Sequence, residues 1–353
     1  MGIAQILDAM DLAKGERALF LADREADGSE GPAALAAMAL AEAATARGCE
    51  AEAVTYVRTR SHGSEPPEEV WRAAWGKGYA SLPPMLRARL YEKTADARDM
   101  EDALRWARAV GDAAPDVVVA TTTHSTSHTS FRRLLTDGAG ARYGSMPQFD
   151  EGLLRKGGPL DADLVAGTKR LVAKLAGARR VRVRGEGTDL SFSVEGRTFH
   201  GDDGDLSRPG AFGNLPGGEA YTAPIEGTAK GRLRLVAAPN RILDSVVDLI
   251  IIEGAVKEIS GSDPFAARMN EILREHPEHL RVAELGIGTN PGASRMENIL
   301  EAEKILGSVH IAFGDNATFG GTQRVPFHED YVVPRATLEI DGEKILDRGT
   351  PRW

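Results

Sequence analysis

Histidine and carboxylate side chains gather in the last third of the chain, in a pattern that can hold a metal ion. His328 and Asp330 are two residues apart, and two such residues in a strand point to the same face of a sheet. His310 begins another predicted strand and can bring a third donor from a neighbouring strand. The single cysteine, Cys49, excludes thiolate clusters and an internal disulfide. The spacing therefore indicates a divalent metal site carried by strands.

A structural role is the alternative interpretation of these residues. H-x-D pairs arise by chance, and a lone histidine on an apolar strand is more often a hydrogen-bonded core residue. The surroundings favour the metal site, because Glu284, Asp315 and Glu329 gather near the histidines. Buried acidic groups are costly unless a cation or hydrogen bonds pair them.

Two further segments carry residues that can do chemistry. Glu219 follows Gly217 and Gly218 in LPGGEAYTAP and can serve as a ligand or general base, although the segment alone favours an exposed hairpin with a solvated glutamate. His124 and His128 follow a predicted parallel strand, where ligands bind in open α/β sheets. An N-cap for a helix starting near residue 129 explains that second segment equally well.

Composition limits the classes of function. The 353 residues carry 43 basic and 52 acidic side chains, a net charge of −9, which favours neither nucleic acid nor an anionic membrane as a partner. The N-terminus lacks the pattern of a signal peptide. The longest apolar stretch, 246–256, is interrupted by charges and too short to span a bilayer. We expect a cytoplasmic protein.

The first half of the chain alternates strand and helix patterns, which indicates an α/β domain with an open parallel sheet over residues 1–160. We expect strands over 17–21, 51–57 and 116–123, and helices over 31–48, 100–110 and from 130. The Gly-rich stretch Lys156–Pro159 has linker composition and places the domain boundary near residue 160.

The second half is strand-rich and predicts an α+β catalytic domain over residues 161–353. The expected strands are 179–184, 189–194, 232–237, 249–253, 309–313, 331–333 and 337–340, and the expected helices are 162–175, 264–274 and 296–306.

Four motifs in chain order resemble the metallo-aminopeptidases of the aminopeptidase T and aminopeptidase S type: GGEAYTAP, AELGIGTNP, VHIAFGDN with TFGG, and the H-E-D triplet. The resemblance is strongest over residues 210–345 and extends faintly through TTTHSTSHT. It implies a Rossmann-like N-terminal domain, a C-terminal catalytic domain, a homodimer and two divalent ions, zinc or cobalt. The ligands that it implies are Glu219, Glu284, His310, His328 and Asp330, with Glu284 also the general base.

This resemblance implies a metal-dependent hydrolase, an aminopeptidase that cleaves N-terminal residues of small peptides or a related amide through a metal-activated water. One departure weighs against peptide hydrolysis. The peptidases carry a tyrosine seven residues after the histidine that matches His310, whereas this chain has Ala317 there and Phe319 nearby. The gap between His310 and His328 is also shorter than in the peptidases.

The same superfamily includes an iron-dependent dioxygenase that opens the ring of a dihydroxypyridine, and this is the alternative function. One Fe(II) would be held by a facial triad of His310, His328 and Asp330, with His124 and His128 binding substrate or transferring protons. In that enzyme a histidine replaces the glutamate that matches Glu284, so the retained Glu284 favours the hydrolase. A third possibility is a binding protein with a decayed or structural metal site, which the retention of all five ligand types opposes.

Overall fold

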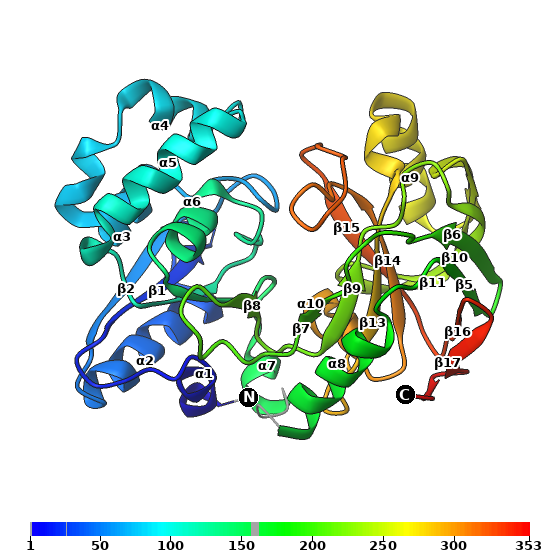
Figure 1. Ribbon diagram of the computed structural model, residues 1–353, viewed down its shortest axis with the longest axis horizontal. Helices are drawn as coiled ribbons and strands as arrows, with labels where there is room; N and C mark the ends of the chain where they lie inside the picture. Colours follow the sequence, from blue (N-terminus) through cyan, green and yellow to red (C-terminus); the bar gives the residue numbers. More distant parts are fainter. Residues whose placement is uncertain (1, 26, 157–161) are drawn as a thin grey trace. The chain divides into compact units, whose positions relative to one another are not determined.

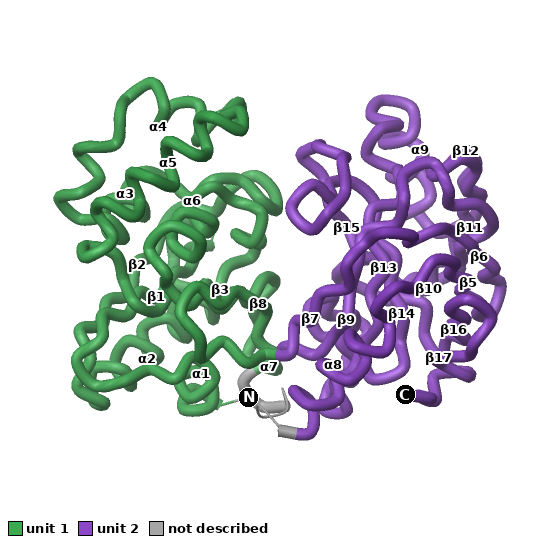
Figure 2. Tube along the Cα trace, in the orientation of Figure 1, with its two compact units in different colours: residues 1–160, 204–216 green, residues 161–203, 217–353 purple. Residues whose placement is uncertain are grey.

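The computed structural model describes residues 2–25, 27–156 and 162–353. The chain forms two compact units, one of residues 1–160 and 204–216, the other of residues 161–203 and 217–353 (Figure 2). The expected division near residue 160 omits the return of residues 204–216 to the first unit. Gly157–Pro159 of the expected linker lie outside the described residues.

The first unit is built on a parallel sheet with the strand order β2-β1-β3-β4-β8. Figure 1 labels β1, β2 and β8 of this sheet. Its strands are β1 (Arg17–Arg24), β2 (Glu50–Val57), β3 (Val117–Thr121), β4 (Arg142–Ser145) and β8 (Phe212–Asn214). All five residues of β3 are buried, as expected for an apolar run covered on both faces of a parallel sheet. The predicted open parallel sheet of an α/β domain is confirmed.

The helices of the first unit include α2, whose Ala-rich sequence starts at Pro32 and packs against β1 and β2. They are α1 (Ile3–Ala9), α2 (Pro32–Ala46), α3 (Glu68–Trp75), α4 (Pro84–Tyr91), α5 (Ala97–Ala109), α6 (Ser130–Arg133) and α7 (Glu151–Lys156). Trp71 on α3 is fully buried, and its ring contacts those of Tyr91 and Phe131, each 5.3 Å away between centroids. This aromatic cluster joins the helices to the sheet.

The second unit contains two antiparallel sheets, as its strand-rich sequence predicts. The eight-stranded sheet has the order β12-β11-β10-β6-β5-β16-β17-β18, and the five-stranded sheet has the order β15-β14-β13-β9-β7. One buried apolar core contains Val183 and Leu233 of the first sheet together with Leu285 and Ile311 of the second.

The bounds of these elements are β5 (Arg180–Gly185), β6 (Thr188–Ser193), β7 (His200–Asp202), β9 (Glu219–Thr222), β10 (Lys230–Ala238), β11 (Arg241–Ile252), β12 (Ala255–Gly261), β13 (Val282–Gly288), β14 (Val309–Gly314), β15 (His328–Val333), β16 (Thr337–Ile340), β17 (Glu343–Asp347), β18 (Thr350–Pro351), α8 (Ala162–Lys174), α9 (Pro264–Glu275) and α10 (Ile299–Ala302).

Three expectations for this unit need correction. The expected helix over 296–306 is reduced to α10 and flanking turns. The strand expected over 331–333 starts at His328, and the strand expected over 249–253 starts at Arg241. β13, which carries Glu284, was not predicted as a strand, because its small residues Ala283, Gly286 and Gly288 weaken the β-propensity signal. No helix among the described residues is long and apolar enough to cross a membrane.

Trp71→Ala should destabilise the first unit by about 3–5 kcal/mol, because it removes a fully buried ring and leaves a cavity. Urea unfolding followed by far-UV circular dichroism measures the loss. Val57→Ala is the control, since Val57 is 76% exposed and should change stability by less than about 0.5 kcal/mol. A loss below about 1 kcal/mol for Trp71→Ala would contradict this packing.

Candidate metal centre

One face of the five-stranded sheet carries all five donors that the sequence predicts. Glu219 is on β9, Glu284 on β13, His310 on β14, and His328 and Asp330 on β15. The register places Glu219 opposite Gly288, and both Glu284 and Asp330 opposite Ala312. Residues two apart on a strand share a face, so these side chains all point to the same side while Leu285 and Ile311 enter the core. The exposed hairpin considered for Glu219 is wrong, because Glu219 is buried.

The donor atoms lie within a few ångströms of one another. His310 Nε2 is 3.2 Å from Glu219 Oε2, 3.4 Å from Glu284 Oε1 and 3.9 Å from Asp330 Oδ1. His328 Nε2 is 3.5 Å from Glu284 Oε2 and 3.7 Å from Asp330 Oδ1. Glu284 therefore faces both histidines, one with each oxygen, and a single oxygen of Asp330 also faces both.

Each of these pairs is close enough to share a metal ion, and the donors divide into sets that contain one histidine each. Two ligand atoms that are each about 2.1 Å from one ion lie at most about 4.2 Å apart, and every pair given above meets this limit. Potential ligand sets within 4.8 Å are Glu219–Glu284–His310, Glu284–His328–Asp330 and Glu303–His310–Asp330. Glu219 Oε2 is buried and, apart from its ion-pair contact with His310 Nε2 at 3.2 Å, makes no hydrogen bond among the described residues.

The orientation of His328 is fixed by the backbone. Its Nδ1 lies 2.8 Å from the carbonyl oxygen of Asp315, to which it can donate only when that nitrogen carries the proton. Nε2 then faces the carboxylates. This is the outer hydrogen bond that metal-binding histidines ordinarily make, and it holds the ring in the orientation that a ligand needs.

Gly286 makes room for the His310 ring. The two residues are paired across β13 and β14, and a Cβ at Gly286 would lie 2.0 Å from both Cε1 and Nε2 of His310. No real Cβ approaches another heavy atom so closely. Any side chain at this position would therefore displace the ring from the carboxylates.

The electrostatic field at the centre favours positive charge. Burial lowers the pKa of His328, but Asp330 and Glu284 outweigh it and raise that pKa to about 10. Burial also opposes the charge on His310, yet its contacts with Glu219 and Glu284 raise its pKa well above the ordinary value. The pKa of Glu284 is raised because burial disfavours its charged form. A divalent cation would meet the same attraction that the imidazolium ions meet.

The centre opens at β15. The side chains of His328 and Asp330 are 15% and 17% exposed to solvent, whereas that of His310 is 1% exposed. A small molecule can therefore reach the donors of β15 most directly.

A buried lysine, missed by the sequence analysis, lies beside the five donors. Lys304 Nζ is 2.5 Å from Glu219, 2.9 Å from Glu303 and 3.4 Å from Asp202. Burial lowers the pKa of Lys304, but these carboxylates raise it well above its ordinary value, so the ammonium ion persists. Lys304 follows the short helix α10, and the surrounding EAEKIL has no spacing that points to the sheet.

His124 and His128 belong to the first unit, whereas the five donors belong to the second. His124 Nδ1 is 2.8 Å from the carbonyl oxygen of Thr59, and the ring of His124 is 5.2 Å from that of His62. Thr129 caps α6 by accepting a hydrogen bond from the Arg132 N–H, as the alternative interpretation of this segment expected. Substrate binding by the two histidines remains a prediction.

The chain is similar to one protein family in sequence and to two enzymes of known structure in fold. The family model "NicX: 2,5-dihydroxypyridine 5,6-dioxygenase" matches residues 114–352, a range that includes all five donors and Lys304. No curated protein matches the chain. The structure of 2,5-dihydroxypyridine dioxygenase from Pseudomonas putida KT2440 is similar, with 18% identity, coverage of 99% of this chain and 95% of that chain, and a TM-score of 0.72.

Wild-type AmpT from Thermus thermophilus is also similar, with 17% identity, coverage of 99% of this chain and 98% of that chain, and a TM-score of 0.62. Structural likeness at these identities establishes a shared fold. It supports the predicted combination of an α/β domain with an open parallel sheet and an α+β second domain, whose sheets are antiparallel in the structure.

Gly286→Ala should weaken Fe(II) or Zn²⁺ binding about 100-fold or more, because the new methyl group displaces His310. Equilibrium dialysis with elemental analysis measures the binding, and far-UV circular dichroism checks the fold. Gly167→Ala is the matched control, since its Cβ would meet only an Arg170 side-chain nitrogen at 3.8 Å. Unchanged affinity in Gly286→Ala would show that the metal binds elsewhere.

Proposed function

The chain belongs to the 2,5-dihydroxypyridine 5,6-dioxygenase family, and from this premise we propose that it is a metal-dependent dioxygenase that opens the ring of a dihydroxypyridine-like aromatic compound. The observation that carries the proposal is the family match over residues 114–352, which spans the whole donor cluster. The hydrolase, which the retained Glu284 favoured in the sequence, becomes the second candidate.

In this proposal His310, His328 and Asp330 hold one Fe(II), since two imidazoles and a carboxylate are the donor set typical of non-haem iron oxygenases. Asp330 Oδ1 lies 3.9 Å from His310 Nε2 and 3.7 Å from His328 Nε2, so this carboxylate links the two histidines. No ligand set within 4.8 Å among the described residues contains both histidines, so the two rings would have to move closer together to share the ion. When bound, Fe(II) supplies the activation of dioxygen that ring opening requires.

Lys304 supports one ion rather than two. Its ammonium group lies 2.5 Å from Glu219 and 2.9 Å from Glu303, so a cationic side chain already neutralises the carboxylates on the β9 side of the cluster. A second metal ion held by Glu219 would meet the repulsion of this ammonium ion at close range. The lysine thus acts as a permanent counter-charge in place of a second cation.

Glu284 can move a proton in either candidate reaction. Because burial raises its pKa, its carboxylate accepts a proton more readily than an exposed glutamate does. Its Oε2 lies 3.5 Å from His328 Nε2, on the more accessible side of the cluster. We propose that Glu284 Oε2 takes the proton of a substrate hydroxyl as the ring binds.

Aromatic side chains border the donors and suit a planar substrate. The Phe319 ring lies 6.1 Å from the His328 ring in an edge-on arrangement, and the Tyr221 ring lies 5.6 Å from Phe319. Tyr221 is two residues after Glu219 and shares its face of the sheet. Flat rings at this position can pack against an aromatic substrate.

A two-metal hydrolase is the second candidate, and one observation favours it. Two potential ligand sets, Glu219–Glu284–His310 and Glu284–His328–Asp330, share Glu284, as expected when a carboxylate bridges two ions. In that reaction Glu284 would take a proton from the attacking water and pass it to the leaving amine.

Metal content and substrate choice separate the two candidates. Protein reconstituted under nitrogen with Fe(II) should consume oxygen when 2,5-dihydroxypyridine is added, and should not cleave aminoacyl-nitroanilides with Zn²⁺ or Co²⁺. Asp330→Asn should lower the oxygen-consumption rate about 100-fold or more by weakening a ligand. The matched control is Glu329→Gln, because Glu329 points to the opposite face and binds Arg268. Nitroanilide cleavage without oxygen consumption would overturn the proposal.

Lys304→Met should allow a second divalent ion to bind, because it removes the ammonium ion and leaves the chain length of the side chain nearly unchanged. Elemental analysis should give one additional ion per chain relative to wild type. Lys230→Met, at an exposed position on β10, should leave the count unchanged. If folded Lys304→Met binds the same number of ions as wild type, Lys304 does not take the place of a cation.

A further inference from the structure

A second group of potential metal ligands lies at the end of α9, on a different segment from the candidate centre. The helix ends at Glu275, and the next four residues, His276-Pro277-Glu278-His279, contain two imidazoles and a carboxylate. Pro277 begins the 3₁₀ helix η4 (Pro277–Leu280). His276 immediately precedes this helix, and its ring stacks on that of His279 with centroids 4.8 Å apart.

Backbone hydrogen bonds hold this turn in place. The His276 N–H donates to the carbonyl oxygen of Ile272, at 2.7 Å, and the His279 N–H donates to that of His276, at 2.9 Å. The three side chains project from a four-residue segment whose backbone is held by these hydrogen bonds and by the ring of Pro277. Little backbone conformational entropy therefore remains to be lost when the side chains bind a common ion.

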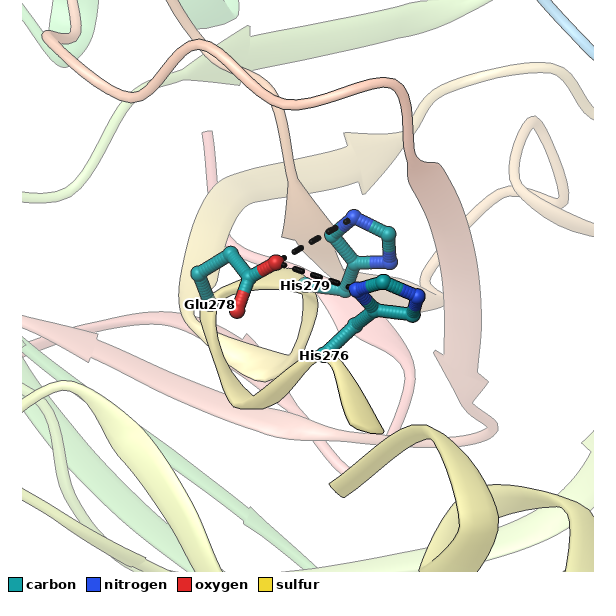
Figure 3. Close-up of side chains that lie close together, drawn as sticks. All are labelled: His276, Glu278 and His279. Carbon is teal, nitrogen blue, oxygen red and sulfur yellow. Dashed lines mark hydrogen bonds and ion pairs between the residues drawn. The ribbon is translucent and has the colours of Figure 1, made fainter. Parts of the chain in front are cut away.

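One oxygen of Glu278 faces both imidazole rings, which stack one above the other (Figure 3). One oxygen of Glu278, Oε1, lies 3.3 Å from His276 Nδ1 and 3.8 Å from His279 Nε2. Ligand atoms from all three residues lie within 4.8 Å of one another. Both distances to Glu278 Oε1 are below the limit of about 4.2 Å for atoms that share an ion. Because imidazoles bind a metal in the plane of the ring, the exposed His276 ring must turn out of its stack with His279 to complete the site.

Aromatic packing fixes the inner histidine. The His279 ring stacks on Phe327 with centroids 5.2 Å apart and planes 10° apart, and on its other side stacks with His276 at 4.8 Å and 17°. Its side chain is 13% exposed, whereas that of His276 is 58% exposed. One ligand is therefore held by packing, and the other two remain accessible to an ion from solvent.

From these contacts we propose that His276, Glu278 and His279 form a second, solvent-accessible site for a divalent transition-metal ion of the imidazole-preferring kind, such as Zn²⁺, Ni²⁺ or Cu²⁺. Two imidazole nitrogens and one carboxylate oxygen match the ligands of these ions, and water completes the coordination on the exposed side. Mg²⁺ and Ca²⁺ prefer oxygen ligands and are not expected here.

The protonation states agree with metal binding. Burial lowers the pKa of His279, which favours the neutral ring that a metal requires. The pKa of Glu278 is lowered first by a hydrogen bond to its own backbone N–H and then by the neighbouring histidines, so its carboxylate is ionised at neutral pH.

This site affects how metal counts are interpreted. A chain with one ion in the candidate centre and one at the α9 turn would contain two ions, the number expected of a two-metal hydrolase. Elemental analysis of wild-type protein alone cannot separate these cases. Variants of the α9 turn can, because they change only the surface site.

Equilibrium dialysis against Zn²⁺ followed by elemental analysis tests the proposal. His276→Ala should lower the zinc content by one ion per chain, whatever number the candidate centre holds, and should weaken the surface site about tenfold or more. Glu278→Gln should weaken it in the same direction. Glu275→Gln is the matched control, since Glu275 is a neighbouring exposed acid outside the cluster and should leave the count unchanged.

The difference between variants decides the outcome independently of the reaction catalysed. Equal zinc contents for wild type and His276→Ala overturn the surface site, even if the candidate centre binds iron as proposed. A loss of one zinc ion in His276→Ala with unchanged circular dichroism supports it, even if the proposed dioxygenase activity is absent. Asp330→Asn provides the complementary measurement, because it should reduce metal in the candidate centre and leave the surface zinc in place.

Discussion

Negative charge gathered on one face of the five-stranded sheet is the constraint on which the rest of the second unit depends. Glu219, Glu284 and Asp202 are buried there, and Asp330 is nearly so. Burial raises the pKa of the neighbouring Glu303 to about 8. Lys304 is the buried ammonium ion set against them. Burying this many carboxylates is unfavourable unless cations compensate them. The pKa of His328 is raised to about 10 because the neighbouring carboxylates stabilise its positive charge.

Two features of the sheet allow it to carry these charged groups: side chains alternate between its two faces, and small residues leave space beside the donors. One face of β13 and β14 supplies Leu285 and Ile311 to the shared core, so the strands cannot shift register without burying the charged face there. On the other face, Gly286 leaves space for the His310 ring, and the Asp315 carbonyl oxygen orients His328. A rigid, largely apolar scaffold thus holds polar groups that would otherwise be separated by water.

The sequence predicted the part of the centre that depends on local spacing. His328 and Asp330 share a face because they are two apart on a strand, and that relation is visible in the sequence. Lys304 was not predictable, because it reaches Glu219 through tertiary folding across 85 positions of sequence separation. The strand of Glu284 was missed because glycines give it weak β-propensity. The expected helix over 296–306 is mostly turns around the short α10, and Lys304 in one of these turns binds Glu219 of the sheet.

The central claim is that one divalent ion lies among His310, His328 and Asp330, with Lys304 in place of a second ion. The most direct measurement is an anomalous difference map at the iron edge, from crystals grown with Fe(II) under nitrogen. The account predicts a single iron peak within about 2.3 Å of His328 Nε2 and an oxygen of Asp330, with Lys304 still bound to Glu219. Two metal peaks bridged by Glu284, with Lys304 displaced from Glu219, would contradict it.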